Sequence, residues 1–263
     1  MNAGRNGHGP IYCLEGISKI YPDVVALAPL SLEIRREERV AIVGPSGSGK
    51  TTLLHMLGGV IQPDQGRVVI DGRNMASMAS GREKAGLVGM IHQQFDLVPR
   101  LSVLHNVLAG RLGYWSLWRS LISLISPQER HLATEALRKA GIEDKISQRT
   151  SRLSGGEQQR VAIARLLVQD SQVILADEPV ASLDPTRSED IVRLIREIAE
   201  ESGKTLVASL HSVPLVRAHF TRVIGLRKGT LAFDLPVTQV TDDILTELYD
   251  LEGNRDGVLS SAS

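Results

Sequence analysis

Short runs of mostly apolar residues, each closed by a glycine-rich or polar turn, recur along this chain between longer segments. Such runs are typical of buried strands, and they lie at 40–43, 86–91, 173–177 and 205–210. Further strands are expected at 11–14, 30–34, 67–70, 222–226 and 231–233. Asp71-Gly72 after one of them is typical of a hairpin turn. Strands that alternate with helical segments indicate an α/β fold.

The longer segments repeat apolar residues at three- and four-residue spacing, as amphipathic helices do. They predict helices over 51–57, 127–140 and 185–202, closed by Gly58, Gly141 and Gly203. Ser126 and Glu129 fit a capping box, with Pro127 at the first helical position. Because the composition changes between 95 and 146, this segment is predicted to be a helical insertion in the α/β frame.

The strand at 40–43 runs into Gly44-Pro45-Ser46-Gly47-Ser48-Gly49-Lys50-Thr51, which matches the phosphate-binding pattern G-x-x-x-x-G-K-[ST]. Glycines let the backbone curl so that its N–H groups point at phosphate oxygens, and the helix N-terminus adds partial positive charge. Lys50 can reach the β- and γ-phosphates, and the Thr51 hydroxyl can ligate Mg²⁺. The full spacing between a strand and a helix favours this interpretation over a chance glycine-rich turn.

Asp177 and Glu178 end the apolar run at 173–177. Successive strand side chains point to opposite faces, so one carboxylate can serve a metal ion while its neighbour faces an attacking water. The alternative is that they only cap the following helix. A phosphate-binding loop in the same chain favours the catalytic interpretation.

Three more candidates are single residues, two of them after predicted strands and Tyr21 before Pro22, between the strands expected at 11–14 and 30–34. His211 follows the strand at 205–210, where ligand sites of open α/β sheets lie. Gln93 follows the strand at 86–91 and could ligate a metal or orient a water, and Tyr21 could stack on a base. Each has an ordinary alternative: a structural histidine, a surface glutamine and a tyrosine that only packs.

A second anion site is predicted at Ser154-Gly155-Gly156-Glu157. Ser154 and Glu157 fit a capping box, and the two glycines leave the backbone open at a helix N-terminus. A well-capped helix without a ligand is the alternative.

Tyr114, Trp115 and Trp118 cluster in a chain that is only 3% aromatic. They form either the core of the helical insertion or an exposed patch that docks a partner, and the sequence leaves both open.

Composition narrows the class of protein. The 263 residues are 42% hydrophobic with zero formal net charge, which is ordinary for a soluble protein and gives no global attraction to nucleic acid or anionic membrane. Cys13 is the only cysteine, which excludes an intrachain disulfide and favours a reducing compartment. Arg111 and Arg119 interrupt the apolar stretch 107–125, so no membrane span is expected there.

Taken in order, these motifs make the chain, from about residue 12 to 251, resemble the ATP-binding subunit of an ATP-binding-cassette (ABC) transporter. Residues 44–51 look like Walker A, 154–156 like the signature motif, 173–177 like Walker B and 182–184 like the D-loop. Glu157 departs from the commonest signature residue, glutamine, and since members of the family do carry glutamate there, activity is expected to survive.

The resemblance implies a role for each matching residue. Glu178, His211 and Gln93 would be catalytic, and Thr51, Gln93 and Asp177 would hold Mg²⁺. ATP would be bound by the following residues: Tyr21, Gly44, Pro45, Ser46, Gly47, Ser48, Gly49, Lys50, Thr51, Thr52, Ser154, Gly155, Gly156 and Asp184.

The resemblance also implies a fold and partners. A P-loop NTPase fold is expected over 11–253: a RecA-like core, an antiparallel β subdomain and a helical signature subdomain at about 95–165, between flexible ends at 1–10 and 254–263. A homodimer would associate with transmembrane permease subunits on the cytoplasmic face of the inner membrane. A periplasmic or lipoprotein solute-binding protein would be an indirect partner, and nucleic acid is not expected to be one.

Three segments resemble the phosphonate-importer branch: 178–185, 110–114 and 224–227. This kinship suggests import of phosphonate, phosphite or a related phosphorus oxyanion. A cassette ATPase of a soluble phosphonate-metabolism complex and an importer ATPase for another small solute remain the alternatives.

Overall fold

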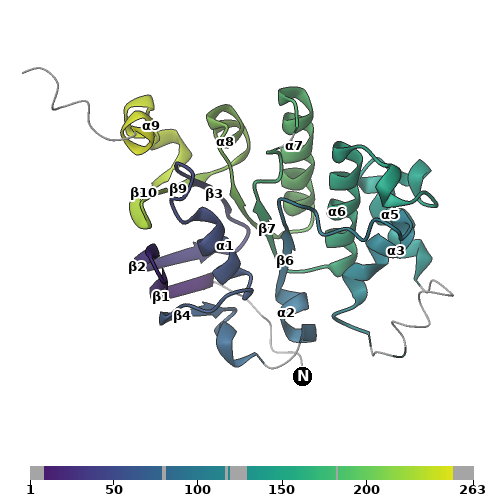
Figure 1. The fold of residues 1–263 in the computed structure, drawn as a ribbon, viewed down its shortest axis with the longest axis horizontal. Coiled ribbons are helices and arrows are strands. Elements are labelled where there is room, and N and C mark those ends of the chain that lie inside the picture. Colours follow the sequence, from purple (N-terminus) through teal and green to yellow (C-terminus); the bar gives the residue numbers. More distant parts are fainter. Residues whose placement is uncertain (1–8, 79–80, 116–117, 119–128, 182, 251–263) are drawn as a thin grey trace, which may run out of the picture.

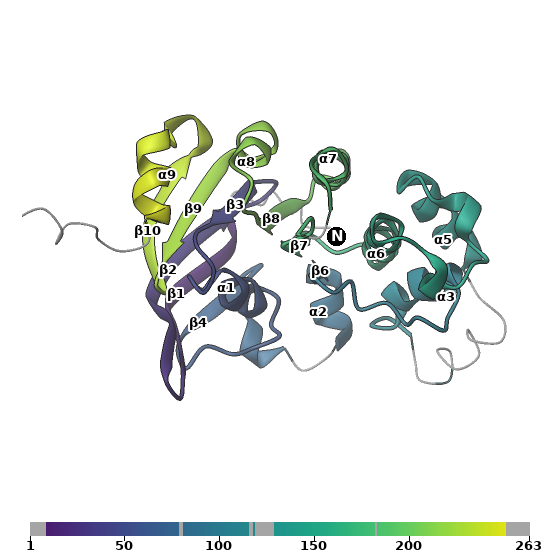
Figure 2. The same cartoon turned by 45° about the horizontal axis from the view of Figure 1, so that its top comes forward.

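The computed structural model describes residues 9–78, 81–115, 118, 129–181 and 183–250. Two β-sheets enclose one helix, further helices cover the outer face of the larger sheet, and a helical group lies at one end (Figures 1 and 2). The predicted α/β fold is confirmed.

The smaller sheet is antiparallel, with the order β2-β1-β4-β5. Its strands are β1 (Pro10–Tyr21), β2 (Val24–Arg35), β4 (Gln65–Ile70) and β5 (Arg73–Asn74). β1 and β2 are far longer than the predicted runs, because shifts in register let their pairing continue past Gly16. The predicted hairpin is confirmed, since Asp71 and Gly72 both have positive φ.

The larger sheet has the order β10-β9-β3-β8-β7-β6, parallel except for β10. Its strands are β3 (Arg39–Val43), β6 (Val88–Ile91), β7 (Val173–Asp177), β8 (Thr205–Ser209), β9 (Arg222–Arg227) and β10 (Thr230–Pro236). The carboxyl ends of β3, β7 and β8 therefore meet at one edge, as the position of the predicted site requires.

The strand predicted at 86–91 begins too early. Gly86 and Leu87 end the helix α2 (Gly81–Leu87), and the strand starts at Val88. The side-chain amide of Gln169 donates hydrogen bonds to the carbonyls of Ala85 and Val88. This contact from a distant helix fixes the boundary, and local hydrophobicity could not show it.

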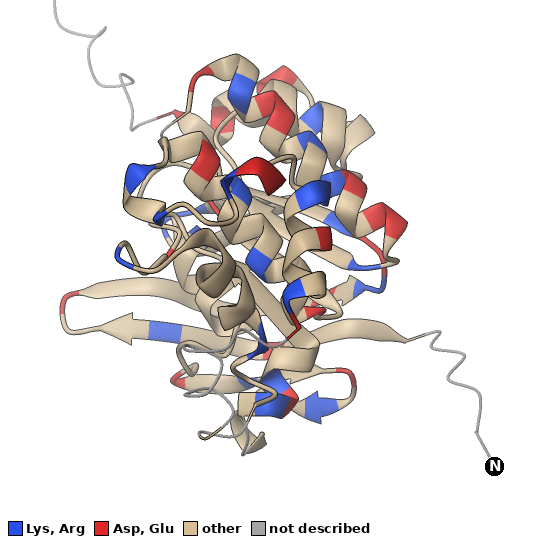
Figure 3. Ribbon diagram, turned by 90° about the vertical axis from the view of Figure 1, so that its right-hand side faces the viewer, with Lys and Arg blue, Asp and Glu red and all other residues tan. Residues whose placement is uncertain are grey.

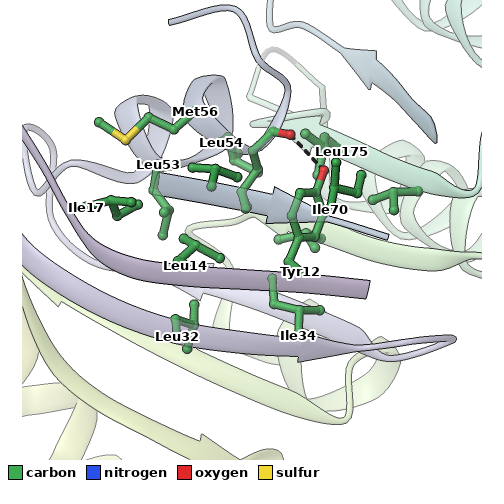
Figure 4. Close-up of a cluster of buried hydrophobic side chains, with 14 of the residues drawn as sticks. Tyr12, Leu14, Ile17, Leu32, Ile34, Leu53, Leu54, Met56, Ile70 and Leu175 are labelled. Carbon is green, nitrogen blue, oxygen red and sulfur yellow. Dashed lines mark hydrogen bonds between the residues drawn. The ribbon is translucent and has the colours of Figure 1, made fainter. Parts of the chain in front are cut away.

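Helix α1 (Lys50–Leu57) lies between the two sheets and buries Leu53, Leu54 and Leu57. The hydroxyl of Tyr12 from β1 donates a 2.7 Å hydrogen bond to the Leu57 carbonyl (Figure 4). The last turn of α1 is thus tied to the antiparallel sheet, which fixes the helix that begins at the phosphate-binding loop.

Three helices bury their apolar sides in a second core on the other face of the larger sheet (Figure 2). They are α7 (Pro185–Glu201), α8 (Val213–His219) and α9 (Asp242–Tyr249). The predicted helix over 185–202 is confirmed, with Asp184 as its N-cap.

The helical group has its own buried core, which extends from Val103 to Val168. It contains α3 (Val103–Leu108), α5 (Arg130–Lys139) and α6 (Gly155–Gln169). The described residues also form short 3₁₀ turns: η1 (Met75–Ser77), η2 (Ala109–Arg111), η3 (Glu143–Lys145), η4 (Thr150–Arg152) and η5 (Val237–Gln239).

Helix α5 is described only from Arg130, whereas the sequence predicted a start at Pro127. Ser126 and Pro127 lie outside the described residues. The proposed capping residue Glu129 has a left-handed backbone and caps α5 without a side-chain hydrogen bond. The predicted end is confirmed, because Gly141 has a φ of 68° directly after the helix.

The aromatic cluster at 114–118 has both buried and exposed members, so each of the two predicted alternatives holds for part of it. Trp115 packs against the core of the helical group, and the Tyr114 hydroxyl donates a 3.0 Å hydrogen bond to the Gln169 carbonyl. Trp118 is 77% exposed. Two of the rings are therefore structural, and Trp118 is the exposed member of the cluster.

Acidic and basic residues are interspersed over the helices in the view of Figure 3, in agreement with the zero net charge. Within the described part of the chain, no helix combines the length and apolar character that a membrane crossing requires.

Candidate functional site

The loop between β3 and α1 carries the phosphate-binding pattern. Gly47 and Gly49 have φ values of 77° and 103°. A Cβ at Gly49 would lie 2.5 Å from the Ala26 carbonyl oxygen, so this turn requires glycine. Helix α1 begins at Lys50, so the loop curls around the positive end of the helix.

Lys50 folds back over this loop, and its Nζ donates to the carbonyl oxygens of Gly44 (2.9 Å) and Pro45 (3.1 Å). Burial lowers the pKa of Lys50, while the carboxylates of Glu178 and Asp177 act in the opposite direction. A nearly buried ammonium group therefore faces two carboxylates across the loop.

Asp177 is the buried acid of the site, with 5% exposure. Its Oδ1 accepts hydrogen bonds from the hydroxyls of Thr51 (3.2 Å) and Ser209 (2.8 Å). Sequence reasoning missed Ser209, although a serine inside an otherwise apolar strand is a signal that could have found it. Carboxylate and hydroxyl oxygens from β7 and α1 make a donor set that suits a small divalent cation.

Glu178 turns away from its neighbour because its φ is 45°, in the left-handed region. The Ser209 hydroxyl accepts a 2.8 Å hydrogen bond from the Glu178 amide and thereby holds this backbone turn. The Glu178 Oε1 lies 2.6 Å from Nε2 of His211. The structure thus brings the second acid and the histidine together, at the ends of adjacent strands.

Other candidate residues lie outside this group. Gln93 follows β6, is exposed, and makes no hydrogen bond to Thr51 or Asp177 in the described structure. Tyr21 ends β1 with 43% exposure, and the Lys19 ammonium lies 5.7 Å from its ring centre.

The signature-like segment at 154–156 belongs to α6 in the helical group. Across the described ranges, no hydrogen bond joins it to the phosphate loop. The two segments predicted to bind anions therefore do not form one site within a single chain.

The capping box at this second segment is confirmed. Oε2 of Glu157 accepts hydrogen bonds from the backbone amide (2.8 Å) and hydroxyl (2.9 Å) of Ser154. The bond from the backbone amide is the main reason why the pKa of Glu157 is lowered.

Comparison with known families decides the class of protein. The family model described as "ABC transporter" matches residues 27–181. The chain belongs to this family.

Individual relatives agree with the family match. The chain is 48% identical over 250 residues to the phosphonates import ATP-binding protein PhnC of Anaeromyxobacter dehalogenans, covering 94% of this chain and 50% of that protein. It is 46% identical over 239 residues to PhnC 1 of Pseudomonas aeruginosa PAO1, covering 90% of each. The dimeric ATP-binding cassette MJ0796, solved with ADP and Pi, aligns with a TM-score of 0.74 at 33% identity, over 86% of this chain and 98% of that one.

The capping box at Glu157 leads to a prediction for ATP turnover and stability, because the chain belongs to the ABC transporter family. We expect Glu157→Gln to retain ATP turnover within about twofold, because an amide oxygen can still accept from the Ser154 amide. At about pH 7 the carboxylate stabilises the start of α6, and this contribution is lost as the pH falls through its lowered pKa. The stability difference between wild type and variant, measured by urea unfolding, should therefore shrink between about pH 7 and pH 3.

A stability difference that stays constant over this pH range would contradict the role assigned to the Glu157 carboxylate. Ser154→Ala is the matched variant, since it removes the hydroxyl from the same box and leaves the titrating group in place.

Proposed function

We propose that this chain is the ATP-binding and ATP-hydrolysing subunit of an importer for phosphonates, phosphite or a related phosphorus oxyanion. The observation that carries the proposal is 46% identity to a phosphonates import ATP-binding protein over 90% of both chains. Identity of this extent over the full cassette supports a shared role more strongly than the fold does, because one fold serves many functions.

ATP would bind first at the phosphate loop. The amides of 44–52 and the ammonium of Lys50 supply donors for its phosphates, and the exposed ring of Tyr21 is available for the adenine. Mg²⁺ would be held by oxygens of Thr51, Asp177 and Gln93, and it would neutralise charge on the transferred phosphoryl group. The hydroxyl and carboxylate pair found at Thr51 and Asp177 fits such an ion.

Hydrolysis then requires a base for the attacking water. Glu178 is the residue we assign, because it points away from the cation-binding carboxylate and its backbone is fixed by Ser209. His211 contacts Oε1 of Glu178 and would also contact the γ-phosphate. As the oxygen of the water attacks the γ-phosphorus, the proton would go to Glu178. The bond between the γ-phosphorus and the β–γ bridging oxygen would break, which leaves ADP and inorganic phosphate.

A second copy of the chain would complete each site. Ser154, Gly155 and Gly156 carry a helix N-terminus that is remote from the phosphate loop of its own chain, and Asp184 caps the nearby α7. Two copies arranged head to tail would place each signature segment against the other copy's ATP. The dimeric state of the solved cassette MJ0796 supports this arrangement.

The cassette would extend over 11–253, with the helical subdomain at 95–165 as the part that meets the membrane partner. Gln93 joins the core to this subdomain, and the exposed Trp118 offers an aromatic contact for transmembrane permease subunits. The complex would lie on the cytoplasmic face of the inner membrane, with a solute-binding protein delivering the cargo from the other side.

The proposal is tested with the chain coexpressed with neighbouring permease and binding-protein genes and reconstituted in vesicles. ATP hydrolysis is measured with methylphosphonate, phosphite, phosphate and sulfate as the added solute. Stimulation by a phosphorus oxyanion is the expected result. Stimulation by another solute would show that the proposed cargo is wrong. Full activity without a membrane partner would favour a soluble complex.

A further inference from the structure

The last described helix, α9, reaches back to the phosphate loop. The hydroxyl of Tyr249 accepts a 3.3 Å hydrogen bond from the backbone amide of Gly44, 205 residues earlier in the chain. Within the described residues, this hydroxyl is the acceptor found for that amide. Burial raises the pKa of Tyr249, although the bond from Gly44 opposes this effect, so the hydroxyl stays neutral at physiological pH.

Helix α9 is fastened at the end that carries Tyr249. The guanidinium group of Arg227 donates to the carbonyl oxygens of Glu247 (2.9 Å) and Asp250 (2.7 Å). These carbonyls belong to the last turn of the helix. Carbonyl oxygens there have no donors within the helix and carry partial negative charge. Leu245 and Leu248 are buried in the second core, and Tyr249 packs against the same core.

The end of β9, which carries Arg227, also lies against Gly44. Arg227 ends β9, and a Cβ at Gly44 would lie 2.1 Å from the Leu226 carbonyl oxygen. Lys50 donates to the Gly44 carbonyl, so the two backbone groups of Gly44 are held by Tyr249 and by the phosphate-binding lysine. Loss of the hydrogen bond to Tyr249 would therefore act on Gly44, whose carbonyl accepts from Lys50.

We propose that Tyr249 is a positioning residue for ATP binding, because its hydroxyl holds Gly44 where the phosphate loop leaves β3. The inference rests on the proposed function of this loop. Without the hydroxyl the Gly44 amide is left unpaired, and the loop occupies its binding-competent conformation for less of the time. Binding of ATP weakens while the catalytic groups at 178 and 211 stay in place.

The test is Tyr249→Phe in the full-length chain, which keeps the ring and removes one oxygen atom. We expect the KM and Kd for ATP to rise about twofold to tenfold, with kcat unchanged. Affinity is measured by titration with a fluorescent ATP analogue and KM by steady-state hydrolysis. Arg227→Gln, which releases the helix and leaves Tyr249 present, should raise KM in the same direction.

Tyr114→Phe is the matched control, because it removes a tyrosine hydroxyl that is bonded to Gln169 in the helical group. Its ATP affinity should equal that of wild type. An unchanged KM in Tyr249→Phe, even with a lower melting temperature, would overturn the inference and leave the proposed function intact. A fall in kcat at constant KM would overturn it as well. Failure of the wild-type chain to bind ATP would instead remove the proposed function.

Discussion

Glu178→Gln should lower kcat for ATP hydrolysis by at least about 100-fold, because a positioned general base contributes about 10²- to 10⁴-fold to such steps. The amide can still hydrogen-bond His211, but it cannot accept the proton of the attacking water. ATP affinity should be retained, since Glu178 is not among the groups assigned to hold the phosphates. We expect the variant to accumulate as an ATP-bound dimer, which size-exclusion chromatography with and without ATP would detect.

A second glutamate–histidine pair provides the matched control. Oε1 of Glu189 lies 2.7 Å from Nε2 of His219, between α7 and α8. Glu189 lines the same cavity as Glu178 and His211, but no hydrogen bond joins it to either in the described structure. Glu189→Gln should keep wild-type turnover. If Glu178→Gln hydrolyses ATP at the wild-type rate, or never dimerises with ATP, the assignment of Glu178 and the proposed dimer are wrong.

Lys50→Ala should lower ATP affinity by about tenfold to 100-fold, because hydrogen bonds from a charged donor contribute about 1.5–3 kcal/mol. The ammonium lies almost buried against the Gly44 and Pro45 carbonyls, so the loop already holds it at the proposed phosphate site. Nucleotide stabilises only the state that binds it, so the rise in melting temperature on adding ATP should largely disappear. Differential scanning fluorimetry with an ATP titration measures this.

Lys204 is a suitable control for the loss of a largely buried lysine. Its Nζ pairs with Asp170 at 2.8 Å, where the ends of α6 and α7 meet. Lys204→Ala should lose some stability and keep the full shift with ATP. An equal shift in Lys50→Ala would show that the loop amides bind the phosphates without help from the lysine.

Much of the site was predictable because its groups follow local patterns. The glycine spacing of 44–51 is recognisable without the rest of the chain, since Gly44, Gly47 and Gly49 all have positive φ within the loop. Asp177, Glu178 and His211 each end an apolar run, and parallel strands bring such ends to one edge. Their proximity in the folded chain follows from this rule.

The contacts that tune the site were not predictable in this way. Ser209 binds both Asp177 and the Glu178 amide, but a serine in an apolar run has no fixed partner until β7 and β8 pair in register. Tyr249 is one more apolar-face residue of a short helix, and its contact with Gly44 depends on where Arg227 fastens that helix. Burial of Trp115 and exposure of Trp118 likewise follow from packing.

The sequence by itself therefore determined the α/β frame, the phosphate loop and the acidic strand end, because periodicity and glycine spacing are local properties of the chain. Only the tertiary structure decided that α2 includes Gly86, that the signature segment lies apart from the phosphate loop, and that α9 reaches Gly44. Each of these depends on how distant parts of the chain pack, as with Gln169 and Ala85, which are 84 residues apart. Such contacts exist only after the chain has packed, so no local pattern encodes them.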